Sequence, residues 1–283
     1  MQFGEPAPDR PVTADLVTSQ SNPVLKRARK LRQRKYREKE GAFFVEGIQP
    51  VTQAIRHDGG IQMIVLAPAI LGDHPVTQLV EERRSRNTTV VEVDRDAFAS
   101  ISNRDDPSGL AAIVSSAPAA IEDLEIDGDS LFVVLDEVGN PGNLGAIIRT
   151  LDAVRGGGVI LIGSATDPYH PTAVKASMGT IFAVPVCRLP DFGALHEWAA
   201  RAGVSLVTTS SKAEKEHWST EIPLPAALVF GSEGRGLPQD VLESGDVVLR
   251  IPIKGSASSL NLAIAASVMI YEVERRRRHP ETP

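Results

Sequence analysis

The chain has 283 residues, of which 42% are apolar and 23% charged, and its formal net charge is −6. This composition suits a globular protein of one large or two smaller domains, and the negative charge excludes a uniformly basic nucleic-acid binder. Cys187 is the only cysteine and the six histidines are scattered, which excludes an intrachain disulfide and argues against a metal site. No apolar run approaches the roughly 18 residues of a membrane span. We therefore expect a cytoplasmic protein with neither membrane attachment nor metal.

The first distinctive feature is a basic segment near the N-terminus. Residues 1–14 are rich in proline and aspartate and predict a disordered tail. Residues 26–39 then hold nine lysines and arginines against one acid, Glu38. Their apolar residues are too few for a deep core face, so we expect a basic helix on the surface that contacts nucleic-acid phosphates; a merely solvated helix is the alternative. The candidate phosphate-binding residues are Lys26, Arg27, Arg29, Lys30, Arg32, Arg34 and Lys35.

Strands and helices alternate through the first half of the chain, which predicts a small α/β domain over residues 15–115. The expected strands are 41–47, 61–67, 88–93 and 110–114, and the expected helices are 48–57, 76–84 and 97–101. Residues 116–130 start with a stretch rich in serine, alanine and proline, which is typical of a linker.

Residues 131–283 repeat the alternation with more apolar strands, which indicates a parallel sheet covered on both faces. The expected strands are 131–135, 159–162, 183–186, 204–208, 227–230 and 247–251, and the expected helices are 144–154, 172–178, 192–202, 238–243 and 260–275. The last helix is apolar on nearly every side, so we expect it to be buried, with Ser258 or Ser259 as its cap. Asn261 then lies just inside it, and a buried amide needs partners, which indicates a polar pocket there.

Three loops that follow strands in this half carry unusual residues, and such loops are natural ligand sites in a parallel sheet. The first leads from Asp136 through a glycine-rich turn to Arg149, the second is 230–236 with Glu233 among three glycines, and the third is 251–261. The glycine spacing is not that of a dinucleotide fingerprint, and no phosphate-binding GK[ST] is present. For the first loop, a tight connection with a surface arginine is the plain structural alternative.

Taken together, segments 143–149, 230–236 and 251–261 resemble the three motifs of the SpoU/TrmH family of SPOUT methyltransferases. All three occur in order, and the resemblance covers about residues 131–275. The first half is similar, more loosely, to the ribosomal-protein-like RNA-binding domain often fused in front of this catalytic domain. Asn140 stands where many members have aspartate, and asparagine forms the turn equally well.

The resemblance implies a sheet with a deep trefoil knot, a homodimer, and S-adenosylmethionine bound through Gly231, Ile251 and Leu260. It implies methyl transfer to a ribose 2′-hydroxyl of structured RNA, with 23S rRNA favoured and the basic segment as the RNA-binding surface. A tRNA 2′-O-methyltransferase is one alternative, and a non-catalytic RNA-binding or ribosome-assembly protein of the same fold is another. Housekeeping modification and ribosome-directed antibiotic resistance both fit.

The candidate catalytic residues are Asn143, Arg149, Glu233, Ser259 and Asn261. The family's motif arginine is often given the role of base, but a guanidinium is effectively always protonated. We therefore expect Arg149 to bind the target phosphate and to stabilise developing alkoxide charge. Asn143 then holds the loop or the ribose, and Glu233 orders the motif loops or orients Arg149. Ser259 and Asn261 position the nucleotide, although Asn261 alternatively contacts the motif loops. The arginines at 275–278 suit RNA contact and a helix C-terminus equally.

Overall fold

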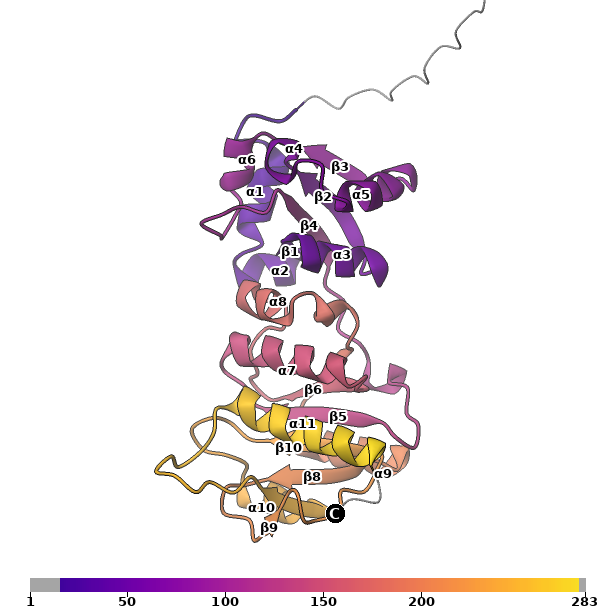
Figure 1. Cartoon of the computed structure of the whole chain (residues 1–283), viewed down its shortest axis with the longest axis vertical. Helices are drawn as coiled ribbons and strands as arrows, with labels where there is room; N and C mark the ends of the chain where they lie inside the picture. The colour runs from indigo at the N-terminus through magenta and orange to yellow at the C-terminus, as the bar shows by residue number, and fades with distance from the viewer. Residues whose placement is uncertain (1–15, 280–283) are drawn as a thin grey trace, which may run out of the picture.

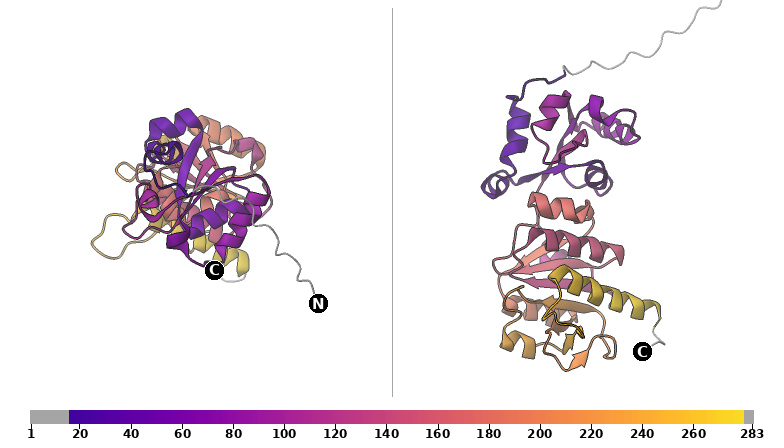
Figure 2. Two further views of the ribbon diagram at one scale, coloured as in Figure 1. Left: turned by 90° about the horizontal axis from the view of Figure 1, so that it is seen from above. Right: turned by 60° about the vertical axis from the view of Figure 1, so that its left-hand side comes forward.

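The computed structural model describes residues 16–279, and the tail predicted at 1–14 lies outside them. The strands form two sheets, one of four strands in the order β1-β4-β2-β3 and one of seven strands in the order β7-β6-β5-β10-β8-β11-β9. Figures 1 and 2 show the two halves of the chain stacked along the long axis of the molecule, with the N-terminal half at one end.

The N-terminal half is a four-stranded sheet flanked by helices on both faces. Its strands are β1 (Ala42–Glu46), β2 (Ile61–Leu66), β3 (Thr89–Glu92) and β4 (Leu110–Ser115). Its helices are α1 (Pro23–Lys30), α2 (Arg34–Glu40), α3 (Ile48–Arg56), α4 (Pro68–Leu71), α5 (Val76–Ser85) and α6 (Arg95–Ala99). Strand β4 pairs antiparallel with β1 and β2, and β2 pairs parallel with β3. The four strands predicted here are confirmed; the one-turn helix α4 was not predicted.

The basic segment differs from the single surface helix that its sequence suggested. It forms two short helices, α1 and α2, separated by a turn at residues 31–33. The expectation of a shallow apolar face is wrong, because Leu25, Ala28 and Leu31 are fully buried against the sheet. Their spacing of three residues places them on one side of α1, which leaves Lys26 and Lys30 exposed on the other. A few apolar residues therefore suffice when all of them share one face.

The C-terminal half is a parallel sheet, as predicted, but it has seven strands rather than six, because the two-residue strand β9 was not predicted. Its strands are β5 (Leu131–Asp136), β6 (Gly158–Ile162), β7 (Val186–Leu189), β8 (Ser205–Thr209), β9 (Lys215–Glu216), β10 (Ala226–Phe230) and β11 (Val247–Arg250). Its helices are α7 (Pro141–Ala153), α8 (Pro171–Ser177), α9 (Phe192–Ala202), α10 (Gln239–Glu243) and α11 (Leu262–Arg278), with 3₁₀ turns η1 (Ile121–Asp123) and η2 (Thr180–Phe182). The strand predicted at 183–186 is wrong: β7 starts only at Val186, because η2 precedes it and Pro185 has no N–H for a ladder.

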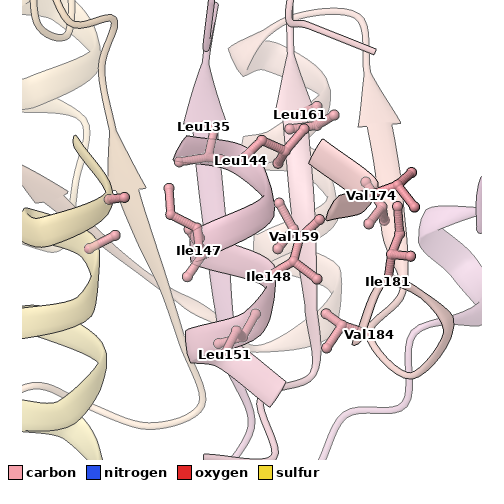
Figure 3. Close-up of a cluster of buried hydrophobic side chains, with 14 of the residues drawn as sticks. Leu135, Leu144, Ile147, Ile148, Leu151, Val159, Leu161, Val174, Ile181 and Val184 are labelled. Carbon is pink, nitrogen blue, oxygen red and sulfur yellow. The ribbon is translucent and has the colours of Figure 1, made fainter. Parts of the chain in front are cut away.

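Helices cover both faces of the parallel sheet. On β5, Leu131, Val133 and Leu135 point to the face covered by α7 and α11, whereas Phe132 and Val134 point to the face covered by α9. This alternation is the two-residue period of a strand, and burial on both sides explains why the strand reads as a continuous apolar run. Figure 3 shows the α7 layer, where Leu144, Ile147, Ile148 and Leu151 lie over Leu135, Val159 and Leu161.

One apolar core runs from the N-terminal sheet into the C-terminal half. The ring of Phe43 on β1 lies 4.6 Å from that of Tyr169 and 6.0 Å from that of Phe182, measured between ring centres. Burial raises the pKa of Tyr169 to about 12. A Cβ on Gly179 would lie 2.8 Å from the Cα of Pro50, so the two backbones pass very closely there. The halves are therefore joined by a packed surface as well as by residues 116–130.

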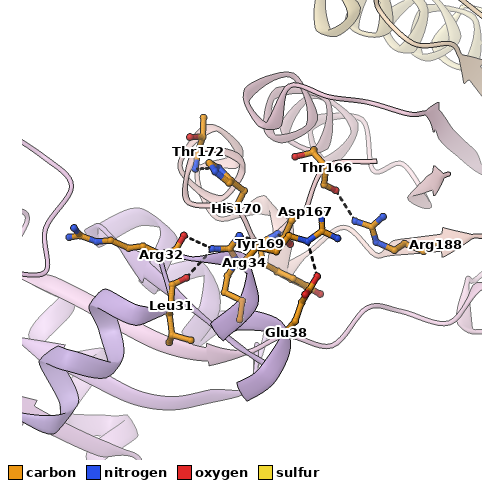
Figure 4. Close-up of polar contacts among 11 residues, drawn as sticks. Leu31, Arg32, Arg34, Glu38, Thr166, Asp167, Tyr169, His170, Thr172 and Arg188 are labelled. Carbon is orange, nitrogen blue, oxygen red and sulfur yellow. Dashed lines mark hydrogen bonds and ion pairs between the residues drawn. The ribbon is translucent and has the colours of Figure 1, made fainter. Parts of the chain in front are cut away.

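A buried ion pair adds a polar connection to this surface. Arg37 of α2 is only 3% exposed, and its Nε and Nη2 lie 2.8 and 2.6 Å from Oδ2 of Asp167. Its Nη1 donates to the carbonyl oxygens of Leu31 and Arg32 at 3.0 and 2.7 Å. Figure 4 shows these acceptors converging from the two halves of the chain. The guanidinium is thus satisfied on all sides, which is the condition for burying a charge.

We predict that Asp167→Asn destabilises the protein by roughly 3 kcal/mol, because it leaves the Arg37 charge buried without a counter-ion. Urea unfolding measures the change. Asp58→Asn is the matched control: Asp58 pairs with Arg83 at 2.8 Å but is 87% exposed, so its loss should cost less than about 1 kcal/mol. Equal losses in the two variants would contradict a structural role for the buried pair.

Candidate active site

The three unusual loops meet at the edge of the parallel sheet where its strands end. Strands β5 and β10 are neighbours, with Phe230 opposite Leu135, so the loops after them start side by side. The loop after β11 returns to the same place, because its last residue, Asn261, hydrogen-bonds Asn143 at the start of α7. The sequence therefore placed these loops correctly at one edge of the sheet.

A junction of three side chains holds the loops together. The Nδ2 of Asn143 donates to Oε1 of Glu233, and the Oδ1 of Asn143 accepts a hydrogen bond of 3.2 Å from Nδ2 of Asn261. Asn143 is buried and stands in the middle, so both ends of its amide are used. Each motif contributes one residue to this junction. Glu233 was expected either to order the motif loops or to orient Arg149; in the structure its side-chain partner is Asn143 and not Arg149.

Both helices that enter the junction are capped by asparagine. Oδ1 of Asn140 accepts from the backbone N–H of Gly142 at 2.8 Å at the start of α7. Oδ1 of Asn261 accepts from the N–H of Ala263 at 2.9 Å at the start of α11. The expectation that Ser258 or Ser259 caps this last helix, with Asn261 inside it, is wrong. Asparagine is among the strongest N-caps, and here its Nδ2 stays available for Asn143.

The second loop is a tight turn that depends on glycine. A Cβ on Gly231 would lie 2.1 Å from the carbonyl carbon of Gly236, a clash that no side chain tolerates. The N–H of Gly236 donates to the carbonyl oxygen of Ser232 at 2.9 Å and closes the turn, which presents Glu233 and Arg235. Close backbone approach thus explains the glycines of this motif.

Arg149 lies on α7, six residues after Asn143, and is exposed. Within residues 16–279 it has no hydrogen-bond or ion-pair partner, so its guanidinium is free to bind a ligand. Ser259 and Leu260 are also exposed, and Gly231 and Ile251 are half-buried. The cofactor contacts of Gly231, Ile251 and Leu260 stay predictions.

A second polar contact at this edge was not predicted. Arg235 forms an ion pair with Glu137, which follows β5 directly. Burial and the neighbouring Glu137 raise the pKa of Asp136, while Arg235 opposes that rise. The backbone of Glu137 has a φ of +45°, a rare value for a side-chain-bearing residue. No sequence signal marks such a contact, because its partners are almost one hundred residues apart.

The described residues contain no helix long and apolar enough to cross a membrane, and no cluster of three or more His, Cys, Asp or Glu side chains that could hold a metal ion. A cavity of about 1070 Å³ lies at the opposite edge of the sheet, where the strands start, and acidic residues and arginines line it. It is separate from the three loops.

Comparison with known proteins identifies the family to which this chain belongs. Residues 130–271 match the SpoU rRNA Methylase family, and residues 22–112 match an MRM3-like substrate binding domain. The chain belongs to the SpoU rRNA methylase family. It is therefore an RNA methyltransferase, and the resemblance seen in the three motifs is confirmed.

Relatives of this SpoU-family protein match nearly its whole length. An AdoMet-bound rRNA methyltransferase from Sinorhizobium meliloti is 34% identical, with a TM-score of 0.83 over 94% of this chain and 98% of its own. The SpoU methyltransferase AviRb from Streptomyces viridochromogenes, solved with AdoMet, is 29% identical, with a TM-score of 0.79 over 91% and 99%. A 23S rRNA (uridine(2479)-2′-O)-methyltransferase of Streptomyces viridochromogenes is 29% identical over 95% of both chains. These matches confirm the predicted SPOUT fold class.

The SpoU-family protein leaves one face of α11 uncovered. Ile264 and Tyr271 are 55% and 54% exposed, and Leu260 just before the helix is 37% exposed. The expectation of a helix buried on nearly every side is therefore wrong. The face that packs on the sheet and on α7 holds Leu262, Ala266, Met269, Ile270 and Val273. The second face is also apolar, but within residues 16–279 no part of the chain covers it.

The predicted RNA-binding residues of this SpoU-family protein fall into two groups. Three are tied into the fold: Arg27 pairs with Glu40, Arg29 with Ser100, and Arg32 with the carbonyls of Ile101 and Ser102. Arg34 pairs only with Glu38 four residues on, and both side chains are about 60% exposed. Lys26, Lys30 and Lys35 are exposed. The ammonium groups of Lys30 and Lys35 lie 5.7 and 4.9 Å from the centre of the Tyr36 ring. The three lysines and Arg34 are thus the available cations, whereas Arg27, Arg29 and Arg32 are engaged in the fold.

The arginine run at the end of α11 has partners within the fold. Arg275 and Arg276 hydrogen-bond Glu272, and Arg276 also donates to the carbonyls of His217 and Thr220. Burial of Glu272 disfavours its ionisation, but these hydrogen bonds outweigh burial and hold its pKa below the usual range. The contacts favour the structural interpretation of this run.

We predict that Asn143→Ala loosens both loops of the junction. The two lost hydrogen bonds correspond to roughly 1–2 kcal/mol of local stability, so exchange at the hydrogen-bonded amides of the two loops, Gly236, Ala263 and Ile264, should become about 5–30-fold faster. Hydrogen exchange followed by mass spectrometry measures this. Thr150→Ala, on the same helix as Asn143, removes a hydrogen bond of 3.1 Å to Ser267 of α11 and should leave both loops unchanged. Unchanged exchange in Asn143→Ala would show that the junction does not hold the loops.

Proposed function

We propose that this protein transfers the methyl group of S-adenosylmethionine to a ribose 2′-hydroxyl of ribosomal RNA, and of 23S rRNA in particular. The observation that carries the proposal is the junction of Asn143, Glu233 and Asn261, which brings the three family motifs to one edge of the sheet beside a free Arg149. The S. viridochromogenes relative that acts on a uridine 2′-oxygen of 23S rRNA supports the substrate. RNA of this kind places the reaction in the cytoplasm.

The three loops offer the free backbone groups and the apolar side chains that S-adenosylmethionine requires. Residues 251–261 form neither helix nor strand, so their backbone N–H and C=O groups are available to a ligand. Gly231 leaves the backbone bare where the second loop leaves β10, and Ile251 and Leu260 offer apolar surface for an adenine ring. When bound, the cofactor supplies an electrophilic methyl group on a sulfonium. The trefoil knot expected from the family would bring these loops around it.

In this reaction the 2′-oxygen forms a bond to the methyl carbon as the carbon–sulfur bond breaks, a neutral thioether leaves, and the hydroxyl proton passes to a base or to water. The alcohol is a weak nucleophile, so its positioning dominates catalysis. We assign Arg149 to the phosphate beside the target ribose, where it also stabilises negative charge developing on the 2′-oxygen. Asn143, Glu233 and Asn261 position the loops, because their polar atoms are used for one another and for a helix cap. Ser259 is exposed at the same loop and positions the nucleotide.

We assign capture of the RNA to residues 15–115, joined through 116–130 to a catalytic domain over 131–283. The match of residues 22–112 to an MRM3-like substrate binding domain supports this division. The exposed Lys26, Lys30 and Lys35 provide the phosphate contacts.

We further propose that two copies form a dimer through α11. Its exposed Ile264 and Tyr271 make an apolar stripe that starts beside the junction, and a second copy of the same helix would cover it.

The test is to incubate the protein with labelled S-adenosylmethionine and separate pools of rRNA and tRNA, and then to map the label. We expect label on a ribose of the rRNA pool. Arg149→Ala should reduce transfer at least about 100-fold, by loss of a charge-stabilising donor, while calorimetry shows cofactor affinity nearly unchanged. Arg201→Ala, at an exposed site on α9, is the control and should keep full activity. Label in neither pool, or full activity of Arg149→Ala, would overturn the assignment.

A further inference from the structure

The ion pair between Arg235 and Glu137 joins two of the motif loops but lies outside the junction. Arg235 is 80% exposed and Glu137 is 39% exposed. A pair so open to water is screened and shifts a conformational equilibrium by only a few-fold. The fold therefore does not depend on it, and the guanidinium can exchange its partner at little cost.

The two partners differ in how firmly they are held. The backbone of Glu137 is held, because its N–H donates to the carbonyl oxygen of Ile162 at 3.1 Å. Arg235 stands between Gly234 and Gly236 in the turn, where added Cβ atoms would meet nothing within 4 Å. The arginine is therefore the partner with more room to move.

The position of Arg235 is set by the junction. It follows Glu233 by two residues in the same closed turn, and Glu233 is held by Asn143. The surrounding edge is acidic, because Asp136, Glu137 and Glu233 all lie on these two loops. These carboxylates repel the phosphates of an RNA strand that approaches this edge. Binding of RNA there therefore requires a cation in addition to Arg149 to offset the repulsion. A guanidinium suits that purpose because its fork matches two phosphate oxygens.

We propose that Arg235 contacts the substrate: it leaves Glu137 and binds a phosphodiester of the RNA strand next to the target nucleotide. Glu137 holds the guanidinium near the site until the RNA arrives and competes with the phosphate for it. This inference rests on the proposed function, since it assumes an RNA strand at this edge. The alternative is a latch, in which the ion pair merely ties the two loops together.

The two interpretations predict different signs for two variants. If Arg235 binds phosphate, Arg235→Gln removes a contact and weakens RNA binding, whereas Glu137→Gln removes a competitor and strengthens it. If the pair is a latch, both variants break the same contact and both weaken binding. Matched controls change the same charges at the opposite edge of the sheet: Arg201→Gln near the end of α9 and Glu125→Gln before β5.

The experiment is filter binding of transcribed 23S rRNA to each full-length variant at several salt concentrations. We expect Arg235→Gln to bind about ten-fold more weakly, with a salt slope lower by about 1. Glu137→Gln should bind about two- to five-fold more tightly, and both controls should match the wild type. Weaker binding by both variants, or no change in Arg235→Gln, would overturn the proposal.

Cofactor affinity and RNA affinity, each measured apart from methyl transfer, distinguish failure of this inference from failure of the proposed function. Calorimetry with S-adenosylmethionine should give both variants the wild-type affinity; a loss in both would identify a latch that closes the cofactor loops. RNA binding is measured without methyl transfer. If the two variants change RNA affinity in opposite directions but the enzyme labels no RNA, only the proposed function is refuted. If both variants weaken RNA binding while the enzyme is active, only the role of Arg235 is refuted.

Discussion

One buried amide connects the parts of this active site. Asn143 donates to Glu233, 90 residues away in the sequence, and accepts from Asn261, 118 residues away. An amide has both a donor and an acceptor, so it can join a carboxylate to a second amide, which an aspartate at the same position could not do. Because Asn143 is buried, leaving either end unpaired would cost free energy, and this cost favours the arrangement in which all three loops are in place.

The surrounding structure serves to bring that amide and its partners together. Parallel strands end at one edge, so the loops after β5, β10 and β11 leave the sheet on the same side. Asparagine caps start α7 and α11 there, and Gly231 lets the second loop fold back on itself. The packed surface around Phe43 and the Arg37–Asp167 pair join the N-terminal half to the same body. The three motif loops of the enzyme are thus already held together before a methyl donor and an RNA strand bind.

Much of this was predictable from sequence, for reasons that the residues make plain. The continuous apolar run 131–135 indicated a strand covered on both faces, and the three motifs identified the family. Sequence could not show that Asn261 caps its helix, because serines stand just before it and all of them can cap. Nor could it show the exposed side of α11 or the burial of Leu25, since a pattern tells which residues avoid water but not which neighbour covers them. The Arg235–Glu137 pair depends on long-range geometry, which no local pattern carries.

If the junction works as one unit, the effects of removing its members are not independent, and a double-mutant cycle on methyl transfer measures this. The values of kcat/KM on rRNA are compared for Asn143→Ala, Asn261→Ala and the double variant. When two residues act as one unit, the first substitution already removes their joint contribution, so the second lowers kcat/KM little further. We predict that the double variant is no slower than the slower single variant. A double variant whose loss is the product of the two single losses would show that the residues act independently, and it would contradict the account given for this site.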